Sequence, residues 1–371
     1  MEFDFVIVGA GSAGCVLANR LSADPKVSVA LIEAGGPDAS PWIHVPVGYF
    51  KTIKDPALNW MYRTEADKGL NGRSLNWPRG KTLGGSSSIN GLLYVRGQPQ
   101  DYDRWRQMGN LGWGWDDLLP LFKRSEAWEG AADPVRGAQG ELSVSRSRQS
   151  WQVVDAWVEA AKAAGFTFNP DYNGKSQEGV GYFQLTARNG LRCSSAKAFL
   201  KPARSRPNLT VFTEMQVDRI ELEDRRAVAV RGRRHGAPVR ISGRREIILS
   251  AGAIGSPQIL MLSGIGEPDH LSEHGISLKH QLPGVGQNLQ DHLQARPVYR
   301  CKAPTINTRT RGLFNQARIG LEYMLNRSGP LTLAASLGTG FLKTRPDLET
   351  PDIQFHIQPF SANNPTTDTD D

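Results

Sequence analysis

The chain has 371 residues, of which 39% are hydrophobic, 22% charged and 8% aromatic. This composition excludes a disordered or fibrous protein, and the length is enough for two domains or one large domain with insertions. The net charge is +7, and many arginines lie between Arg219 and Arg245, around a predicted turn at His235-Gly236. We interpret this segment as a solvated hairpin, because no nucleic-acid-binding motif accompanies it.

The cysteines and the apolar segments indicate the cellular compartment in which the protein is expected. Cys15, Cys193 and Cys301 have neither the spacing of metal ligands nor that of a disulfide framework, which favours a reducing environment. The chain opens directly with an apolar strand, without the basic region of a signal peptide, and no apolar run is long enough for a transmembrane helix. We therefore expect a cytoplasmic protein without an integral membrane segment, and peripheral membrane association stays open.

Residues 3–33 have the pattern strand, glycine-rich turn, helix, strand and acid. Apart from Asp4 and Ser28, both strands are apolar runs, as in a parallel sheet that is buried on both faces. Gly9 permits the tight turn, Gly11 lets the backbone approach a pyrophosphate, and Gly14 allows the helix to pack closely on the strand. Glu33 can accept hydrogen bonds from a ribose diol. The unit predicts an adenine-dinucleotide site without distinguishing NAD from FAD.

A second glycine-rich segment covers residues 79–97. Its small residues at 84–88 would let the backbone approach phosphates or a large flat group, and the apolar run that follows is untypical of a flexible linker. The run from Gly80 to Asn90 resembles the first signature of the glucose–methanol–choline (GMC) family of FAD-dependent oxidoreductases. Further segments resemble the family in the same order, namely residues 109–126, 251–266 and 284–292.

The segment 246–266 resembles the second signature of the family and also has a structural interpretation. An apolar strand ending at Ser250 should be followed by a helix. We predict that Ser256 caps this helix, that Pro257 is its first residue, and that Gly264 ends it. Such a strand–glycine–helix element would return the chain to the nucleotide-binding sheet.

The resemblance implies FAD as the cofactor. Some relatives carry a histidine bonded to the flavin just before the signature asparagine, and Ile89 at that position predicts non-covalent binding. The resemblance also implies that the backbone of Val217 meets the adenine. No metal site is expected. The full set of expected cofactor-binding residues is Gly9, Gly11, Ser12, Ala13, Gly14, Glu33, Ala34, Thr82, Gly85, Ser86, Asn90, Gly91, Leu93, Val95, Val217, Ala251 and Gly252.

The GMC family oxidises alcohols to aldehydes or ketones. A base takes the hydroxyl proton while a hydride passes to flavin N5, and the electrons go on to a quinone, another carrier or oxygen. The family's base is a histidine in a C-terminal segment, which we expect to lie beyond Asp371 in a truncated chain, so the catalytic residue is unknown. His356 is a candidate to line the substrate pocket, and the alternative is a histidine whose polar atoms are satisfied within the core. The alternatives are an inactive FAD-binding chain and a hydroxynitrile lyase on the same scaffold.

The expected fold class is α/β, or α+β overall. A discontinuous Rossmann-like FAD-binding domain would consist of residues 1–150 and 190–300. An incomplete substrate domain with an antiparallel sheet would consist of residues 151–189 and 301–362, with a strand near residues 351–360. A helix near residues 151–164 should place one stripe in the core, made of Trp151, Val154, Trp157, Val158 and Ala161. Residues 363–371 are polar and predicted to be a disordered tail.

Overall fold

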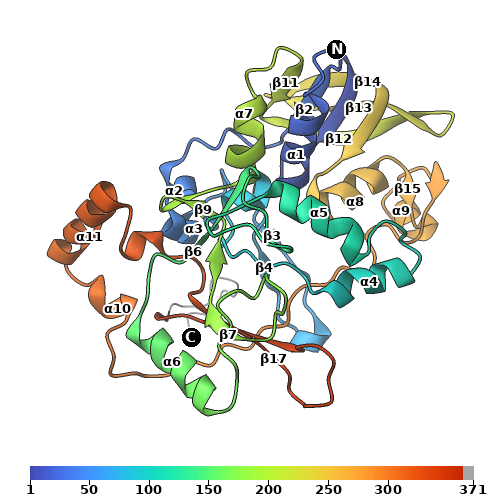
Figure 1. Ribbon diagram of the computed structural model, residues 1–371. Helices are drawn as coiled ribbons and strands as arrows, with labels where there is room; N and C mark the ends of the chain where they lie inside the picture. Colours follow the sequence, from blue (N-terminus) through green and yellow to red (C-terminus); the bar gives the residue numbers. More distant parts are fainter. Residues whose placement is uncertain (362–371) are drawn as a thin grey trace.

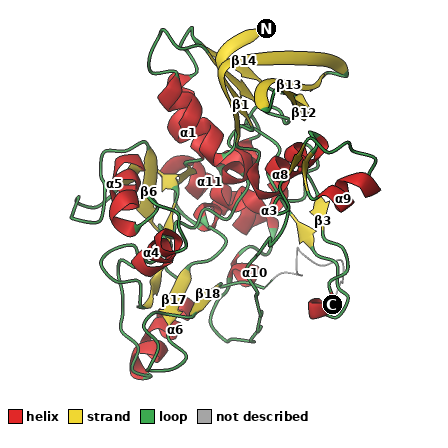
Figure 2. Cartoon of the chain, turned by 90° about the vertical axis from the view of Figure 1, so that its right-hand side faces the viewer, coloured by secondary structure: helices red, strands yellow, loops and turns green. Residues whose placement is uncertain are grey.

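The computed structural model describes residues 1–361 (Figure 1). The predicted tail at 363–371 lies outside the described residues. The fold is mixed α/β: one large sheet with parallel strands lies near the N-terminus, and smaller sheets lie toward the other end of the molecule (Figures 1 and 2). This agrees with the predicted fold class.

The large sheet has the strand order β11-β2-β1-β14-β13-β12. Its strands are β1 (Glu2–Val8), β2 (Val29–Ile32), β11 (Leu209–Phe212), β12 (Met215–Glu223), β13 (Arg226–Arg234) and β14 (Ala237–Leu249). The first half of β14 pairs antiparallel with β13, and its second half pairs parallel with β1. This one long strand therefore joins an antiparallel meander to the parallel sheet. The predicted arginine-rich hairpin is part of that meander, and its turn at His235-Gly236 has positive φ at both residues.

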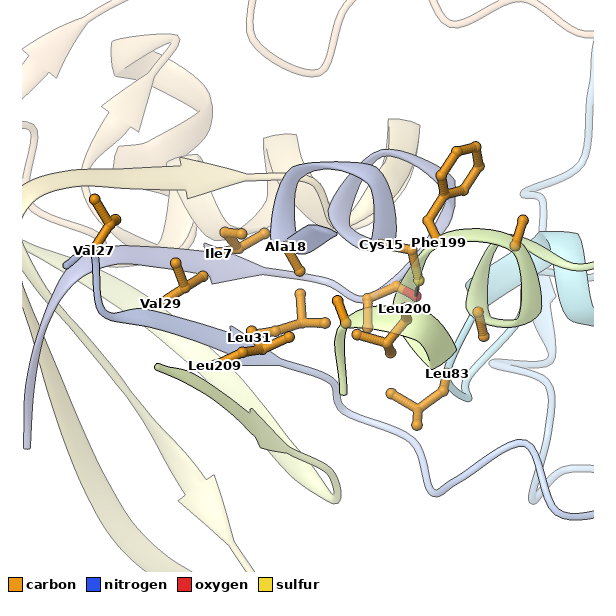
Figure 3. Close-up of a cluster of buried hydrophobic side chains, with 14 of the residues drawn as sticks. Ile7, Cys15, Ala18, Val27, Val29, Leu31, Leu83, Phe199, Leu200 and Leu209 are labelled. Atoms are coloured by element: carbon orange, nitrogen blue, oxygen red, sulfur yellow. Dashed lines mark hydrogen bonds between the residues drawn. The ribbon is translucent and has the colours of Figure 1, made fainter. Parts of the chain in front are cut away.

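The apolar runs of β1 and β2 are buried on both faces of the sheet. Ile7 and Leu31 pack in a cluster with helix α1 (Ser12–Leu21), the π-helical turn Ala196–Leu200 and α7 (Lys201–Ala203) (Figure 3). Val6 and Ile32 belong to the cluster on the other face, which includes side chains of the meander and of α8 (Gly252–Leu262). Because successive side chains of a strand point to opposite faces, this layered arrangement requires the uninterrupted apolar residues 5–8 of β1 and 29–32 of β2.

The predicted start of helix α8 was wrong. The helix begins at Gly252, and Pro257 lies inside it rather than at its first position. Gly252 has φ +80°, a conformation that glycine adopts without strain, and it turns the chain from β14 into the helix earlier than the capping pattern suggested. Although Ser256 lies within the helix, it still binds a backbone donor at the helix N-terminus: its Oγ accepts a hydrogen bond from the Ala251 N–H at 3.0 Å. The predicted end was correct, with Gly264 at φ +85° after Ser263.

A second sheet brings together segments that are far apart in the sequence. β7 (Gly179–Tyr182), β17 (Gly338–Leu342) and β18 (Ile353–Ile357) form an antiparallel sheet in the order β18-β17-β7. The predicted amphipathic helix is present as α6 (Gln152–Ala163), and Val154 and Val158 are buried. A Cβ on Gly338 of β17 would lie 2.9 Å from Val154 Cγ1, so the helix packs directly on this sheet.

Strand pairing also crosses the predicted domain boundary at residue 150. β6 (Leu142–Arg146) pairs in parallel with β5 (Glu126–Trp128) and antiparallel with β8 (Gln184–Leu185). The division into two domains therefore stays a prediction.

The remaining elements are short or lie around these sheets. The helices are α2 (Pro41–His44), α3 (Tyr49–Thr52), α4 (Pro99–Gln107), α5 (Trp115–Ser125), α9 (Pro268–Glu273), α10 (Ile306–Arg309) and α11 (Leu313–Asn326). The strands are β3 (Tyr62–Arg63), β4 (Asn76–Trp77), β9 (Ala187–Arg188), β10 (Leu191–Arg192), β15 (Ile265–Gly266) and β16 (His280–Gln281). Among the described residues, no helix combines the length and apolarity needed to cross a membrane.

Candidate cofactor site

The carboxyl ends of three parallel strands border one cavity of about 500 Å³. Val8 ends β1, Ile32 ends β2 and Leu249 ends β14, and all three residues line it. In open α/β sheets, this edge is where nucleotides bind. The rest of the lining comes from loops, including both glycine-rich segments that the sequence analysis singled out.

The first glycine-rich turn has the geometry that its sequence pattern predicts. Gly9 has φ +97°, and a Cβ there would lie 2.6 Å from Ser250 O. A Cβ on Gly14 would lie only 1.9 Å from Gly9 O, so only glycine lets α1 pack this closely on the turn. At Gly11, by contrast, the nearest atom would be 3.9 Å away. The backbone at Gly11 is therefore open to the cavity, beside the N–H groups of the first turn of α1.

The second glycine-rich loop packs against the first. The Gly84 N–H donates to Ala10 O at 2.8 Å, and a Cβ on Gly85 would lie 2.7 Å from Gly11 Cα. Ser86 follows in the lining of the cavity, and its Oγ accepts a hydrogen bond from the Gly80 N–H at 3.1 Å. The contact between the two loops makes one continuous backbone-lined wall, which fits a pyrophosphate.

Glu33 is a buried carboxylate in this wall, with 6% of its surface exposed. Its Oε2 accepts from the Ala10 N–H and its Oε1 from the Gly35 N–H, both at 2.9 Å. Burial raises the pKa of this carboxyl to about 7, although the backbone N–H bonds act in the opposite direction. A carboxylate has about four acceptor sites, so acceptor capacity remains for a ribose hydroxyl.

The edge strand β12 closes another side of the cavity. Met215, Gln216 and Val217 line it, and one edge of the β12 backbone lies outside the strand ladder because β12 is the last strand of the sheet. Opposite the glycine turn, Ser250 donates its hydroxyl to Gly9 O at 2.7 Å. Backbone groups therefore surround the cavity from several directions, as the binding of an adenine dinucleotide requires.

The structure places most of the predicted cofactor residues around this single cavity. Those in its lining are Gly9, Gly11, Ser12, Ala13, Glu33, Ala34, Gly85, Ser86, Val217, Ala251 and Gly252. Gly14 lies behind the turn. Thr82 is buried and donates its hydroxyl to Gly36 O at 3.0 Å.

Besides Gly14 and Thr82, four more predicted residues lie beyond the lining. Asn90 and Gly91 follow the second loop, Leu93 forms a β-bridge with Leu185, and the side chain of Val95 is 39% exposed. The family resemblance implies that Asn90, Gly91 and the residues after them lie against the flavin ring, and this stays a prediction.

Sequence reasoning missed an aromatic side of the cavity. Trp60 and Tyr62 both line it, with ring centroids 5.7 Å apart and an angle of 4° between the planes. Arg79 also lines it, and its Nη2 lies 4.0 Å from Asp291 Oδ2, which connects the segment 284–292 to the rim. The only sequence signal was the spacing of two aromatic residues in a loop, which carries no recognised motif.

His356 lies on strand β18, as predicted. It is not among the residues that line the nucleotide cavity, and its place in a substrate pocket stays a prediction. Its side chain is accessible to solvent on one side and packs on the buried ring of Phe183 on the other, with the ring centroids 5.0 Å apart. Partial burial, together with the nearby charges of His292 and Arg296, holds the pKa of His356 below its usual value. This histidine is therefore separate from the nucleotide cavity.

Comparison with known proteins agrees with this geometry. Residues 3–294 match the family model of GMC oxidoreductase. The chain is 44% identical over 361 residues to alcohol dehydrogenase [acceptor] of Pseudomonas putida, covering 96% of this chain and 65% of that protein. It is also 44% identical over 359 residues to oxygen-dependent choline dehydrogenase of Brucella ovis, covering 97% of this chain and 65% of that one.

Among solved structures, an FAD-dependent oxidoreductase from Chaetomium thermophilum superimposes with a TM-score of 0.82 at 29% identity. The match covers 92% of this chain and 62% of that one. The chain thus spans about two thirds of the length of these relatives. With a family match over most of its length and a cavity built from the family's two glycine-rich segments, the chain belongs to the GMC oxidoreductase family, whose members are FAD-dependent flavoproteins.

Proposed function

We propose that this chain binds FAD non-covalently in the cavity and forms part of an enzyme that oxidises the CH–OH group of a small alcohol. The observation that carries the proposal is the contact between the two glycine-rich loops, through Gly84 N–Ala10 O and Gly85–Gly11. This contact joins two segments of the sequence into one wall suited to an anion: the first has the dinucleotide-binding pattern, and the second resembles the first signature of the family.

Each part of the cavity suits one part of the dinucleotide. The N–H groups at Gly11, Ser12 and Ala13 would bind the pyrophosphate, since they belong to the start of helix α1. Glu33 would accept hydrogen bonds from the adenosine ribose, and Val217 on the edge strand would meet the adenine. The adenine contact of Val217 is what the family resemblance implies, and the position of each residue in the lining supports these assignments.

Non-covalent binding is supported by Ile89. Its side chain is 2% exposed and packs with Ile43 and Leu58 in a small apolar cluster. An aliphatic side chain offers no atom that could form a bond to the flavin. FAD should therefore be released intact when the protein is denatured.

When bound, FAD supplies the acceptor for the hydride that leaves the carbinol carbon. The substrate class comes from the relatives, one named for alcohols and one for choline. The electron acceptor, whether a quinone, another carrier or oxygen, is left open by both the cavity and the sequence. His356 on β18 stands outside the cavity, so we assign no proton transfer to it.

The proposal is tested by anaerobic titration of the purified flavoprotein with a panel of alcohols that includes choline. Loss of the visible flavin absorbance on adding one of them, with formation of the aldehyde or ketone, would support an alcohol oxidoreductase. Cleavage of a hydroxynitrile without loss of the flavin colour would instead indicate a lyase. A flavoprotein that does neither would be an inactive FAD-binding chain.

A further inference from the structure

Arg192, on the short strand β10, is a buried cation without an acidic partner. It is 1% exposed, and its guanidinium donates to Ile43 O at 2.8 Å, to Ser87 O at 3.1 Å, and to both O and Oδ1 of Asn90 at 2.7 Å. In the part of the chain that the structure describes, no carboxylate forms an ion pair with it. Burial lowers its pKa to about 9, which leaves it charged at neutral pH.

Burial of an unpaired charge is unfavourable, because the charge loses its hydration and gains only dipoles in return. The four acceptors of Arg192 are three carbonyl oxygens and one amide oxygen, so none carries a full negative charge. Two of the residues that supply them, Ser87 and Asn90, follow directly on Gly85 and Ser86 in the cavity wall. The uncompensated charge therefore lies behind the second glycine-rich loop.

The hydrogen bond from Arg192 to Asn90 O fixes the orientation of the peptide group between Asn90 and Gly91. All peptide bonds of the described chain are trans, so the Gly91 N–H points away from the Asn90 C=O that Arg192 binds. No acceptor for this N–H is present among the described residues. Asn90 Oδ1 also accepts from the Leu92 N–H at 3.1 Å, which turns the amide NH₂ of this exposed side chain outward. Two donors are thus presented on the side opposite to Arg192.

The same turn contains a strained residue. Leu92 is fully buried and has φ +64°, a conformation that costs a bulky side chain energy. Its C=O is held by the N–H of Thr186 at 2.8 Å and by the Thr186 hydroxyl at 3.1 Å, and the preceding Gly91 C=O accepts from Ala335 N–H at 3.1 Å. Strain of this kind persists only where surrounding contacts determine the conformation, and here they bind three successive carbonyls.

We propose that Arg192 is a positioning residue for the flavin ring: it holds the 87–92 turn so that the Gly91 N–H and the Asn90 amide face the ring, and its unpaired charge favours the reduced flavin. This inference rests on the proposed function and refines it. A negative charge that develops on the ring would supply the partner that the protein itself does not give Arg192.

The test compares three variants, Arg192→Gln, Arg192→Lys and the control Arg206→Gln. Arg206 is a suitable match because its Nη1 also donates to a backbone carbonyl, that of Asn19, and to the hydroxyl of Ser22, away from the glycine-rich loops. For each protein we would measure the dissociation constants of FAD and of ADP, which is the adenosine half of the cofactor, and the midpoint potential of the bound flavin. Thermal unfolding of the FAD-free proteins checks that they fold.

Arg192→Gln should weaken FAD binding at least tenfold and leave ADP binding within twofold of the wild type. It should also lower the affinity for reduced relative to oxidised FAD about tenfold, or about 30 mV for a two-electron couple. Arg192→Lys keeps the charge but not the four bonds, so it should weaken FAD binding and change the potential little. Arg206→Gln should change none of these quantities.

Unchanged FAD affinity and potential in Arg192→Gln would overturn the inference, as would an equal loss of FAD and ADP binding, which indicates a merely structural role. If Arg192→Gln does not fold, the comparison of FAD with ADP binding in Arg192→Lys decides, because only FAD binding should weaken in that variant. A wild-type chain that binds ADP but not FAD would overturn this inference alone, whereas a chain that binds neither would overturn the proposed function as well.

Discussion

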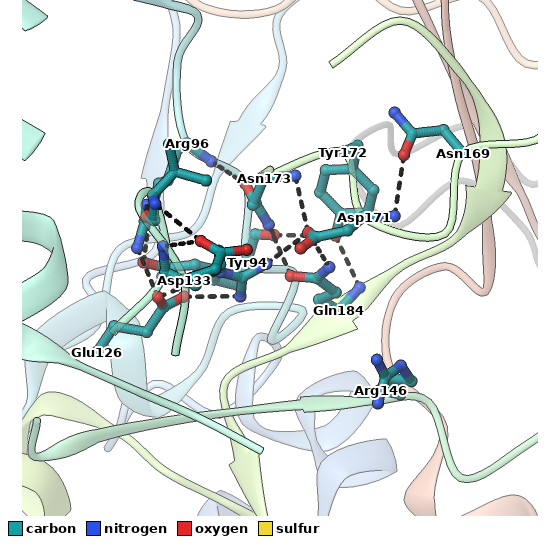
Figure 4. A network of polar contacts seen from close by, with 12 residues as sticks. Tyr94, Arg96, Glu126, Asp133, Arg146, Asn169, Asp171, Tyr172, Asn173 and Gln184 are labelled. Carbon is teal, nitrogen blue, oxygen red and sulfur yellow. Dashed lines mark hydrogen bonds and ion pairs between the residues drawn. The ribbon is translucent and has the colours of Figure 1, made fainter. Parts of the chain in front are cut away.

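The nucleotide end of the molecule and the end that holds the smaller sheets are stabilised by different kinds of contact. At the nucleotide end, backbone meets backbone: Gly14 on Gly9 and Gly85 on Gly11 leave no room for side chains. Toward the smaller sheets, segments that are far apart in the sequence are held together by charged and amide side chains in a buried polar network (Figure 4). Backbone contacts of the first kind require glycines at regular spacing, which a sequence pattern reveals. Contacts between distant charged side chains have no local sequence pattern.

The buried network centres on Glu126, which is 0% exposed. Its carboxylate pairs with Arg96 at 2.6 Å and with Arg136 at 2.7 Å, and Arg136 also pairs with Asp171. Two cations thus meet two anions, so this region is neutral without any ligand. Arg192, buried to a similar extent behind the cofactor loop, has no such anion, which is why a ligand is expected only there.

Removing the central acid should have the largest effect on stability. Glu126→Ala would leave two buried arginine side chains without their shared partner, and we expect the free energy of unfolding to fall by about 3–5 kcal/mol. Chemical denaturation measures this, with Glu159→Ala as a control, because the Glu159–Lys162 pair is exposed and should matter by less than about 1 kcal/mol. Similar losses for both variants would contradict the contrast between the two ends. FAD affinity of the folded fraction should not change.

The pH dependence of stability should come largely from the nucleotide end. Burial raises the pKa of Glu33 in the folded chain from 4.5 to about 7, so the folded state binds the proton more tightly than the unfolded state. Its stabilising contribution is complete below pH 4.5 and is lost as pH rises through 7, a change of about 3 kcal/mol. Denaturation of the FAD-free chain between pH 5 and 8 should show this loss, and Glu33→Gln should flatten it. If the free energy of unfolding changed with pH in the same way in the wild type and in Glu33→Gln, Glu33 would not be the source of the pH dependence.

A single methyl group should break the contact on which the glycine turn depends. In Gly14→Ala the new Cβ would lie 1.9 Å from Gly9 O, a backbone atom that cannot move independently. We expect a loss of about 1–3 kcal/mol in stability, and little or no FAD after purification. Gly36→Ala is the control, because nothing lies within 4 Å of its Cβ position. Normal FAD content in Gly14→Ala would show that the turn tolerates a displacement of helix α1.

The smallest effect is expected at His356. Its side chain is exposed and outside the cavity, so His356→Ala should change stability by less than about 0.5 kcal/mol and leave FAD content unaltered. Loss of FAD on this substitution, measured by absorbance against protein concentration, would extend the cofactor site to strand β18 and blur the distinction between the two ends.

Much of the nucleotide end could be predicted because the close backbone contacts there can be made by glycine alone. Gly9, Gly14 and Gly85 occupy positions where a Cβ would collide with backbone, and a regular spacing marks them. The start of α8 was misplaced because the glycine conformation at Gly252 overrode the serine and proline signals. The pairing of Glu126 with Arg96 and Arg136 had no local signal, since it depends on how distant segments fold together.

The most direct test of the central claim, that this chain itself holds FAD without a covalent bond, is the absorbance spectrum of the purified protein and of its supernatant after acid denaturation. We predict the two-banded spectrum of oxidised flavin in the protein, and its full transfer to the supernatant. Colour that stays with the precipitate would contradict non-covalent binding. A folded but colourless protein that takes up no added FAD would contradict the claim altogether.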